Sequence, residues 1–175
     1  MTTLPDRIIV YGVTGSGKST LARRLAERTG LPWHSVDDCI GWNPGWVGVP
    51  AEEQRARAGE LCAGERWILD SMYSSWRELA LSRAELVVAL DYPRWLSLGR
   101  LLRRTLVRCV TRRRICNGNV ESVRQAFSAD SIIVWHFQSF ARKRDRIRDW
   151  AADPSIPILV LTSPRATRRW LAEVT

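Results

Sequence analysis

The chain has 175 residues, 45% of them hydrophobic, and a formal net charge of +9 at pH 7. This length fits one domain that buries a substantial core, and the composition excludes a disordered chain. No apolar run reaches the roughly 18 residues that a membrane span needs, and the N-terminal residues lack the pattern of a signal peptide. We therefore expect a cytoplasmic protein without a membrane segment.

The charged residues have an unusual balance, because Lys18 and Lys143 are the only lysines among 27 lysine and arginine residues. Arginine suits bidentate binding of phosphate groups. The four cysteines show no Cys-x-x-Cys spacing and the two histidines have no partner at metal-ligand spacing, so we expect free thiols and no zinc site.

Short apolar segments alternate with longer amphipathic ones along the chain. Strands are expected over 7–11, 33–37, 66–70, 85–91 and 156–162. Helices are expected over 19–29, 51–63, 74–81, 93–114 and 120–150, with a last helix that Ser163 caps and Pro164 begins. A loop rich in glycine, proline and tryptophan is expected over 40–50. The alternation predicts an α/β fold whose parallel sheet is covered by helices on both faces and binds ligands at the carboxyl ends of its strands.

The first strand leads into the segment GVTGSGKST, which fits the pattern G-x-x-x-x-G-K-[ST]. Glycines let successive backbone N–H groups turn inward around an anion, and the helix that follows adds its positive end. In this pattern Lys18 reaches the β- and γ-phosphates, and the Ser19 hydroxyl binds Mg²⁺. The segment therefore predicts binding of Mg-ATP by Gly12, Thr14, Gly15, Ser16, Gly17, Lys18, Ser19 and Thr20.

Other nucleotide-binding classes fit less well. Residues 38–41 match the D-x-x-G pattern of GTPases, but they follow the second strand, and the chain has no N-K-x-D to bind guanine. AAA-type motors are longer chains than this one. A small kinase remains.

The chain resembles the P-loop small kinases, which include adenylate, shikimate and gluconate kinases. It is similar above all to bacterial proteins labelled topology modulation protein or adenylate kinase-like ATPase. The resemblance rests on the glycine loop, on WILDSMYS from Trp67, on LDYPRW from Leu90 and on NGN-x-E from Asn117. It implies a five-stranded parallel sheet in the order 2-3-1-4-5 and a small helical lid. The single domain would span 1–175, with an acceptor-binding region over 38–65 and the lid over 100–120.

One segment departs from the family. Relatives read D-G-N-Y after the third strand, where this chain has Asp70-Ser71-Met72-Tyr73. The missing glycine removes a place where an acceptor approaches the backbone closely, so either the acceptor differs or catalysis is weaker. The chain also lacks the D-G-F-P-R segment of nucleoside monophosphate kinases, which argues against AMP as the acceptor.

Carboxylates at strand ends are the expected metal and acceptor groups, because phosphoryl transfer depends on positioning and charge neutralisation. Asp70, together with Ser19, is expected to hold Mg²⁺. Asp37 resembles the aspartate that binds the acceptor hydroxyl and takes its proton, although the adjacent Asp38 leaves this assignment open.

Aromatic and basic residues near these carboxylates are further acceptor candidates. Trp42 and Trp46, with Trp33 as a third, either stack on the acceptor or pin the loop to the core. Arg77 is expected to clamp the acceptor.

Arginines recur every four residues on the helix expected over 93–114, at Arg100, Arg104, Arg108 and Arg112. By the resemblance, Arg100 and Arg104 match two phosphate-contacting arginines of adenylate kinase and would stabilise charge on the transferring phosphoryl group. With Lys18 and Asp37 they form the predicted catalytic set. A solvated helix face is the alternative interpretation of this row.

The sequence thus predicts a phosphotransferase that moves the γ-phosphoryl group of Mg-ATP to a small hydroxyl or phosphate acceptor, either a nucleoside or nucleotide or a small metabolite. It is expected to act as a monomer or homodimer. Two alternatives stay open. Basic clusters over 100–114 and 142–148 fit an ATP-regulated nucleic-acid-binding protein, and the loop alone fits a plain ATPase.

Overall fold

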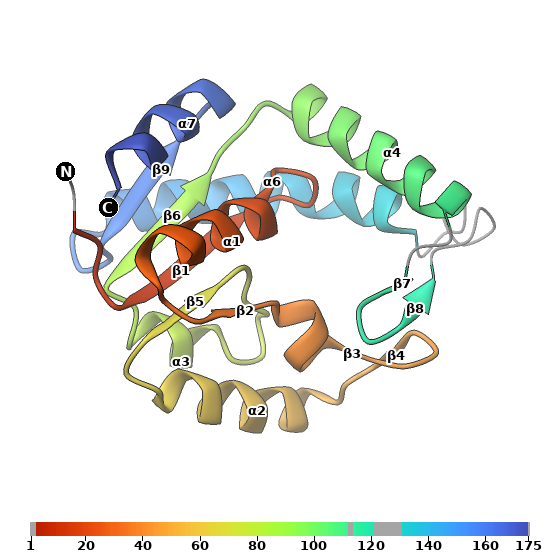
Figure 1. Ribbon diagram of the computed structural model, residues 1–175, viewed down its shortest axis with the longest axis horizontal. Coiled ribbons are helices and arrows are strands. Elements are labelled where there is room, and N and C mark those ends of the chain that lie inside the picture. The colour runs from red at the N-terminus through yellow and green to blue at the C-terminus, as the bar shows by residue number, and fades with distance from the viewer. Residues whose placement is uncertain (1–2, 112–113, 121–130, 175) are drawn as a thin grey trace.

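Five parallel strands form the central sheet of the computed structural model, which describes residues 3–111, 114–120 and 131–174 (Figure 1). The strands are β1 (Arg7–Gly12), β2 (Trp33–His34), β5 (Trp67–Leu69), β6 (Leu86–Leu90) and β9 (Ile158–Leu161). They lie in the order β2-β5-β1-β6-β9, with every pairing parallel. The predicted α/β fold class is therefore confirmed. If only the five strands of this sheet are counted along the chain, their order in the sheet is 2-3-1-4-5. The labels are not consecutive because the strands of two small ribbons are also numbered.

The two ribbons are antiparallel pairs outside the main sheet. One pairs β3 (Trp42–Asn43) with β4 (Val47–Gly48), and the other pairs β7 (Arg114–Ile115) with β8 (Asn119–Val120). The first occupies the segment that we predicted as a loop over 40–50. Both ribbons lie on the same side of the molecule, beyond the carboxyl ends of the sheet strands (Figure 1).

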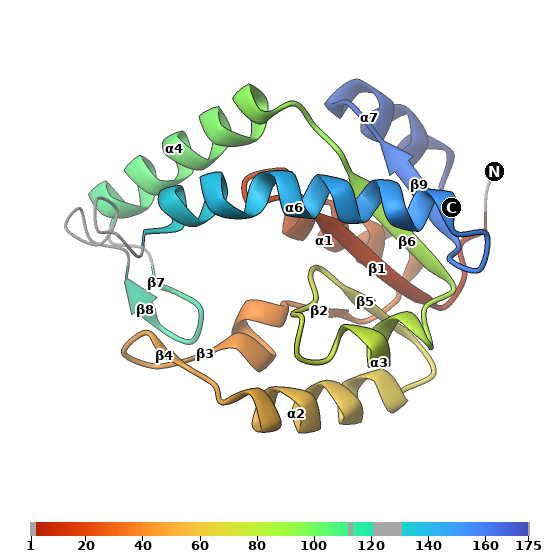
Figure 2. The same cartoon turned by 180° about the vertical axis from the view of Figure 1, so that it is seen from behind.

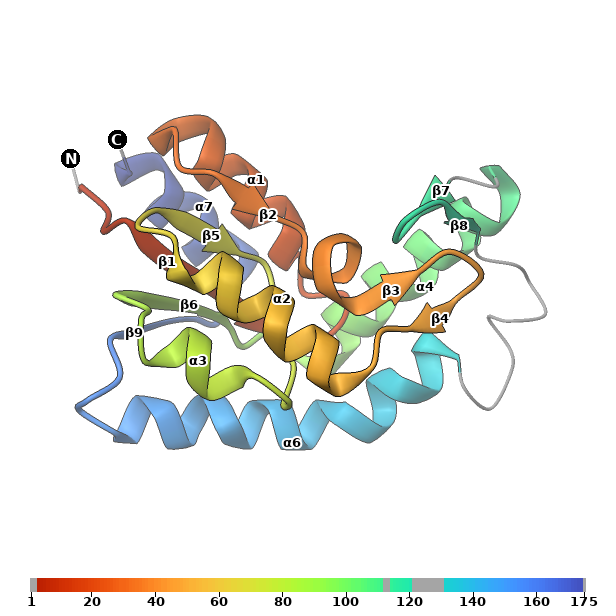
Figure 3. The ribbon, with the colours of Figure 1, turned by 90° about the horizontal axis from the view of Figure 1, so that it is seen from below.

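Helices cover both faces of the sheet. They are α1 (Lys18–Thr29), α2 (Ala51–Ala63), α3 (Arg77–Leu81), α4 (Arg94–Thr111), α6 (Ile132–Ala152) and α7 (Pro164–Glu173), with a short π-helical turn η1 (Asp37–Gly41). Figure 3 shows α1 and α7 on one face and α3 and α6 on the other. Helix α4 extends beyond the sheet beside the first half of α6 (Figure 2).

Strand β1 joins the two halves of the core. Ile9 and Tyr11 pack with residues of α2, α3 and α6, whereas Ile8 and Val10 pack with residues of α1 and α7. Successive strand side chains point to opposite faces, so a strand that is apolar throughout is buried on both sides. The glycine loop that follows β1 is thereby held by a strand that is buried on both faces of the sheet.

Most element boundaries agree with the predictions, but the second strand is shorter than predicted. The Ser35 carbonyl accepts hydrogen bonds from the backbone N–H groups of Asp38 (3.1 Å) and Cys39 (2.9 Å), so the chain turns before Asp37. Asp37 therefore begins η1 instead of ending a strand.

The helical termini follow the capping rules. The Ser163 side chain accepts a hydrogen bond from the Ala166 backbone N–H, and Pro164 begins α7, as predicted. Ser131 caps α6 in the same way, and the part of the predicted helix over 121–130 lies outside the described residues. The four cysteines are free thiols. Among the described residues, no helix is both long enough and apolar enough to cross a membrane.

Candidate functional site

The glycine loop after β1 needs glycine at two positions. Gly15 and Gly17 have φ angles of +83° and +100°, which other residues rarely adopt. A Cβ atom on Gly15 would lie 2.2 Å from the Ser97 carbonyl oxygen of α4. Helix α1 begins directly after Gly17, so its free N–H groups and positive dipole end face the loop. This arrangement fits the phosphate-binding loop that the sequence predicts.

Lys18 is the cation of this loop. Its Nζ donates a hydrogen bond to the Val13 carbonyl oxygen over 3.0 Å. Burial, and then the nearby Lys143 and Arg104, lower the pKa of Lys18 to about 7, while Asp70 and Asp37 act in the opposite direction. A bound anion would restore the charged form of Lys18.

Asp70 lies beside Ser19, as the metal prediction requires. The carboxylate is 4% exposed and accepts hydrogen bonds from the Val36 backbone N–H (3.0 Å) and from the Ser19 hydroxyl. Burial raises the pKa of Asp70, and these two hydrogen bonds lower it. A carboxylate beside a hydroxyl is the oxygen donor set that fits Mg²⁺.

Adjacent Asp37 and Asp38 face different partners. Asp37 accepts a hydrogen bond from the Tyr73 hydroxyl. Burial first, and then the Asp37 carboxylate, raise the pKa of Tyr73, so the phenol stays protonated and keeps donating. Asp38 instead accepts a hydrogen bond from the Asn117 backbone N–H over 3.2 Å. Of the two carboxylates, only Asp37 raises the pKa of Lys18.

The segment Asp70-Ser71-Met72-Tyr73 has clear packing roles. Met72 is buried in the core on the α2, α3 and α6 side of the sheet. Tyr73 holds Asp37, and its hydroxyl lies so close to Gly41 that a Cβ atom there would be 2.2 Å away. The segment therefore positions Asp37, one of the two acidic residues of η1.

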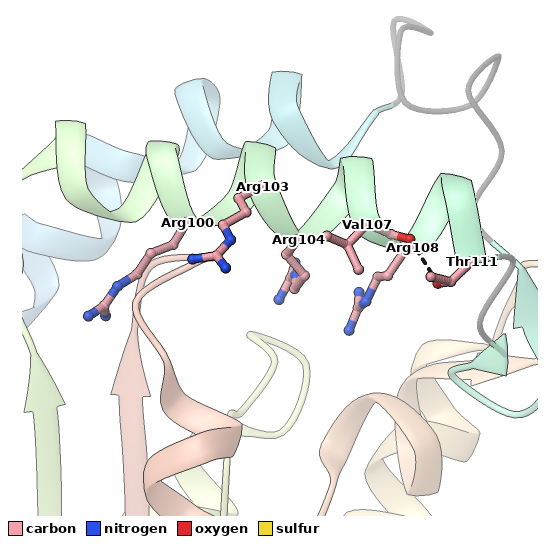
Figure 4. Close-up of a pocket in the computed structure, with 6 residues that line it drawn as sticks. All are labelled: Arg100, Arg103, Arg104, Val107, Arg108 and Thr111. Carbon is pink, nitrogen blue, oxygen red and sulfur yellow. Dashed lines mark hydrogen bonds between the residues drawn. The ribbon is translucent and has the colours of Figure 1, made fainter.

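A row of arginines on α4 reaches the glycine loop through Arg100. Arg100, Arg104 and Arg108 project from one side of α4 and, with Arg103, Val107 and Thr111, line a hollow of about 380 Å³ (Figure 4). Arg100 donates a hydrogen bond to the Ser16 carbonyl oxygen over 3.2 Å. Its guanidinium lies 5.5 Å from the ring centroid of Tyr92. Arg100 thus contacts the loop although it is exposed, and Arg112 lies outside the described residues.

The three tryptophans predicted as acceptor candidates lie in two different places. Trp42 and Trp46 contact each other edge-on, with ring centroids 5.6 Å apart, on the β3–β4 ribbon. Trp33 packs against the core near α1, which favours the interpretation that it pins its segment to the core. Its position at the start of β2 explains this, because the strand directs it to the α1 face.

Arg77 begins α3 and is half-buried. One of its terminal nitrogens is buried, and the described residues offer it no hydrogen-bond partner. Its predicted contact with an acceptor stays a prediction.

The turn between β7 and β8 contacts η1 and the β3–β4 ribbon, which lie in the predicted acceptor region. The Asn117 side chain donates to the backbone oxygens of Asp38 (2.6 Å) and Trp42 (2.7 Å). The Asn119 side chain accepts from the Trp46 backbone N–H (2.8 Å) and donates to the Asn43 carbonyl (3.0 Å). The predicted lid region therefore holds the β3–β4 ribbon in place.

Helix α6 contributes site residues that sequence reasoning missed. Lys143 lies 6.0 Å from the ring centroid of Tyr11, and Arg146 donates to the Tyr11 hydroxyl over 3.3 Å. Burial first, and then Arg142 and Arg146, lower the pKa of Lys143, while Asp37 raises it. One signal was available, since Lys143 is one of only two lysines in the chain. Arg144 of the same helix pairs with Asp91 after β6, over 2.6 Å.

The sheet order, the glycine loop and the flanking helices together give the chain the fold of the P-loop small kinases. Solved structures agree over almost the whole chain. A gluconokinase from Sinorhizobium meliloti 1021 is 18% identical with a TM-score of 0.57, over 98% of this chain and 94% of the other. A shikimate kinase from Acinetobacter baumannii in complex with shikimate is 21% identical with a TM-score of 0.57, over 97% and 90%.

A shikimate kinase from Bacteroides thetaiotaomicron is 14% identical with a TM-score of 0.59, over 95% of this chain and 94% of the other. No protein-family model matches the chain, and no curated protein matches it. At these identities the similarity concerns the fold, and the activity has to be argued from the site.

Proposed function

We propose that the chain is a small-molecule kinase that transfers the γ-phosphoryl group of Mg-ATP to a small hydroxyl-bearing acceptor. The observation that carries this proposal is the convergence of charged groups on Lys18. Asp37 of η1, Asp70 after β5, Arg104 of α4 and Lys143 of α6 all act on its pKa. Such a convergence supports phosphoryl transfer, which needs positioned charges of both signs.

The nucleotide side of this site consists of the loop and the arginines. The loop N–H groups and the end of α1 bind the phosphates, with Lys18 beside them. Ser19 and Asp70 would hold Mg²⁺, which supplies charge neutralisation when it is bound. Arg100 and Arg104 act on the γ-phosphoryl group from the opposite side, and the arginine row excludes water from it.

The acceptor side consists of Asp37 and its neighbours. Asp37, aimed by Tyr73, accepts a hydrogen bond from the acceptor hydroxyl and takes its proton as the oxygen attacks the γ-phosphorus. The bond between the γ-phosphorus and the bridging oxygen breaks, and ADP leaves. The acceptor then carries the phosphoryl group, and the proton passes from Asp37 to solvent.

We propose an anionic, hydroxylated acceptor. The buried nitrogen of Arg77, together with Lys143, supports an acceptor that carries negative charge. The gluconokinase and the shikimate kinase with bound shikimate, which share this fold, make hydroxylated carboxylic acids the first compounds to test.

The test is a screen with labelled ATP over hydroxy acids, sugars, nucleosides and nucleotides, with hydrolysis measured in the absence of acceptor.

With the best acceptor, Asp37→Asn is expected to lower kcat by roughly 10²–10⁴-fold, because it removes the proton acceptor. Asp38→Asn is the matched control, because the Asp38 carboxylate accepts a hydrogen bond from Asn117. Its kcat is expected to change by less than about tenfold. Equal losses in both variants would argue against this acceptor site. Hydrolysis that no acceptor stimulates would favour a plain ATPase.

Asp70→Asn tests the metal site. The variant keeps a hydrogen-bond acceptor for the Val36 N–H but loses the negative charge, so the Mg²⁺ concentration for half-maximal activity is expected to rise roughly tenfold. A magnesium titration of activity at fixed ATP measures this. The affinity for ATP in the absence of Mg²⁺ serves as the control, and in Asp70→Asn it should be no weaker than in the wild-type protein. An unchanged magnesium requirement would remove Asp70 from the metal site.

A further inference from the structure

His136 of α6 contacts the phosphate-binding loop from a fully buried position. Its Nδ1 lies 3.1 Å from the backbone oxygen of Thr14, which is 122 residues earlier in the chain. The ring also packs against Phe140, with centroids 5.5 Å apart. Among the described residues, no group of His, Cys, Asp or Glu side chains could hold a metal ion, so metal binding does not account for this buried imidazole.

The geometry decides which ring nitrogen carries the proton. The partner of Nδ1 is a carbonyl oxygen, which only accepts, so Nδ1 is the donor. In the neutral ring Nε2 then has a lone pair, and this atom is buried with no hydrogen-bond partner among the described residues. Burial, together with the cations Arg94, Lys143 and Lys18, lowers the pKa of His136, which keeps the ring neutral.

The hydrogen bond also determines the orientation of one peptide group. In a planar trans peptide the C=O of Thr14 and the N–H of Gly15 point in opposite directions. With the Thr14 oxygen held by α6, the Gly15 N–H points away from α6. On its other side Gly15 is in contact with α4, where Ser97 and Leu101 leave no room for a Cβ atom. The loop is thus clamped between α4 and α6.

We propose that His136 is a positioning residue that holds the Gly15 N–H in the phosphate cradle through its hydrogen bond to Thr14. The inference rests on the proposed nucleotide site. The clamp means that the loop is arranged for phosphate before nucleotide arrives, so less of the binding free energy is used to order it. It also ties the loop to α4, which runs into the predicted lid, and to α6, which follows the lid in the chain.

The test compares three variants by calorimetric binding of inorganic tripolyphosphate and by steady-state kinetics. His136→Leu removes the donor and is expected to weaken tripolyphosphate binding and raise KM for ATP roughly tenfold, because it leaves a buried carbonyl without its partner. The acceptor KM and kcat should change less than about threefold. His136→Asn places an amide N–H where Nδ1 was and should restore both values to within about threefold. His136→Gln places its amide one bond further along, near the Nε2 position, and should resemble the leucine variant.

The asparagine–glutamine pair keeps the test decisive if the leucine variant fails to fold, because both side chains are polar and amide-bearing. Equal tripolyphosphate affinity in all folded variants would overturn the role of His136. Lys18→Ala separates this outcome from failure of the nucleotide site. If wild-type protein binds tripolyphosphate and Lys18→Ala does not, the site stands and only the positioning role is rejected. If the wild-type protein does not bind tripolyphosphate, both proposals are overturned.

Discussion

Lys18→Ala is expected to lower ATP turnover by at least about 10²–10³-fold, because it removes the cation that faces the developing charge on the phosphates. The fold should persist, since among the described residues the Lys18 ammonium donates its hydrogen bond to the Val13 carbonyl at the rim of the loop. Turnover at saturating ATP and calorimetric ATP binding measure the two effects. Unchanged ATP affinity in this variant would reject the loop as the nucleotide site.

The pH dependence of binding provides a second signature of Lys18. Its pKa of about 7 in the free protein means that the amine is mostly neutral at pH 8. Bound phosphates raise that pKa, so binding at pH 8 should take up nearly one proton, and at pH 6 almost none. Calorimetry in two buffers with different ionisation enthalpies measures the uptake. Lys18→Met keeps the side-chain length and should abolish it.

The same pKa has a consequence for stability. The pKa of Lys18 is lower in the folded protein than the usual value of 10.5, so the unfolded chain binds more protons between these two values. The contribution of Lys18 to stability therefore rises with pH from about 7 to 10.5, and below this range the charged form opposes folding. Lys18→Met should accordingly melt at a higher temperature than the wild-type protein at pH 7 without nucleotide.

Arg104→Ala is expected to lower kcat by about 10³-fold, as loss of an arginine that acts on a transferring phosphoryl group does. ATP affinity should change far less, because the interaction strengthens as charge develops in the transition state. The side chain lines the hollow of α4 between Arg100 and Arg108, and it influences the pKa of Lys18. Turnover at saturating ATP is the primary measurement.

The same variant separates a kinase from a nucleic-acid-binding protein. If the row instead follows a nucleic-acid backbone, Arg104→Ala should keep normal turnover and reduce the salt dependence of DNA binding by roughly one unit. Arg148→Ala is the charge-matched control, because Arg148 is exposed on α6 and pairs only locally with Asp145. A kinase site requires that Arg148→Ala keep its activity while Arg104→Ala loses it.

The loop and its flanking elements could be predicted from the sequence, because everything that makes them is adjacent in the chain. An apolar strand, glycines at the positions with positive φ and a helix directly after them need no distant partner. The α/β class follows from the alternation of strands and helices in the same way. The row of arginines on α4 also followed from helical spacing, since residues four apart lie on one side of a helix.

Pairings of side chains were decided only by the tertiary structure. In the sequence Asp37 and Asp38 are adjacent aspartates, and no neighbouring residue indicates which of the two would bind the acceptor. The turn of η1 directs one to Tyr73 and the other to Asn117, which are 36 and 79 residues away. The sequence pattern predicted a second strand that extends to Asp37. The strand ends earlier because backbone N–H groups bond to the Ser35 carbonyl, and backbone hydrogen bonds of this kind leave no signal in the sequence.

Helix α6 illustrates the same limit at a larger scale. Its existence follows from local pattern, but which face meets the glycine loop depends on how α6 packs across the sheet. That packing brings His136 to Thr14 and Lys143 and Arg146 to Tyr11. The sequence by itself therefore determined the glycine loop and its place after the first strand, and the packing of α4, α6 and η1 around that loop decided which charges surround it.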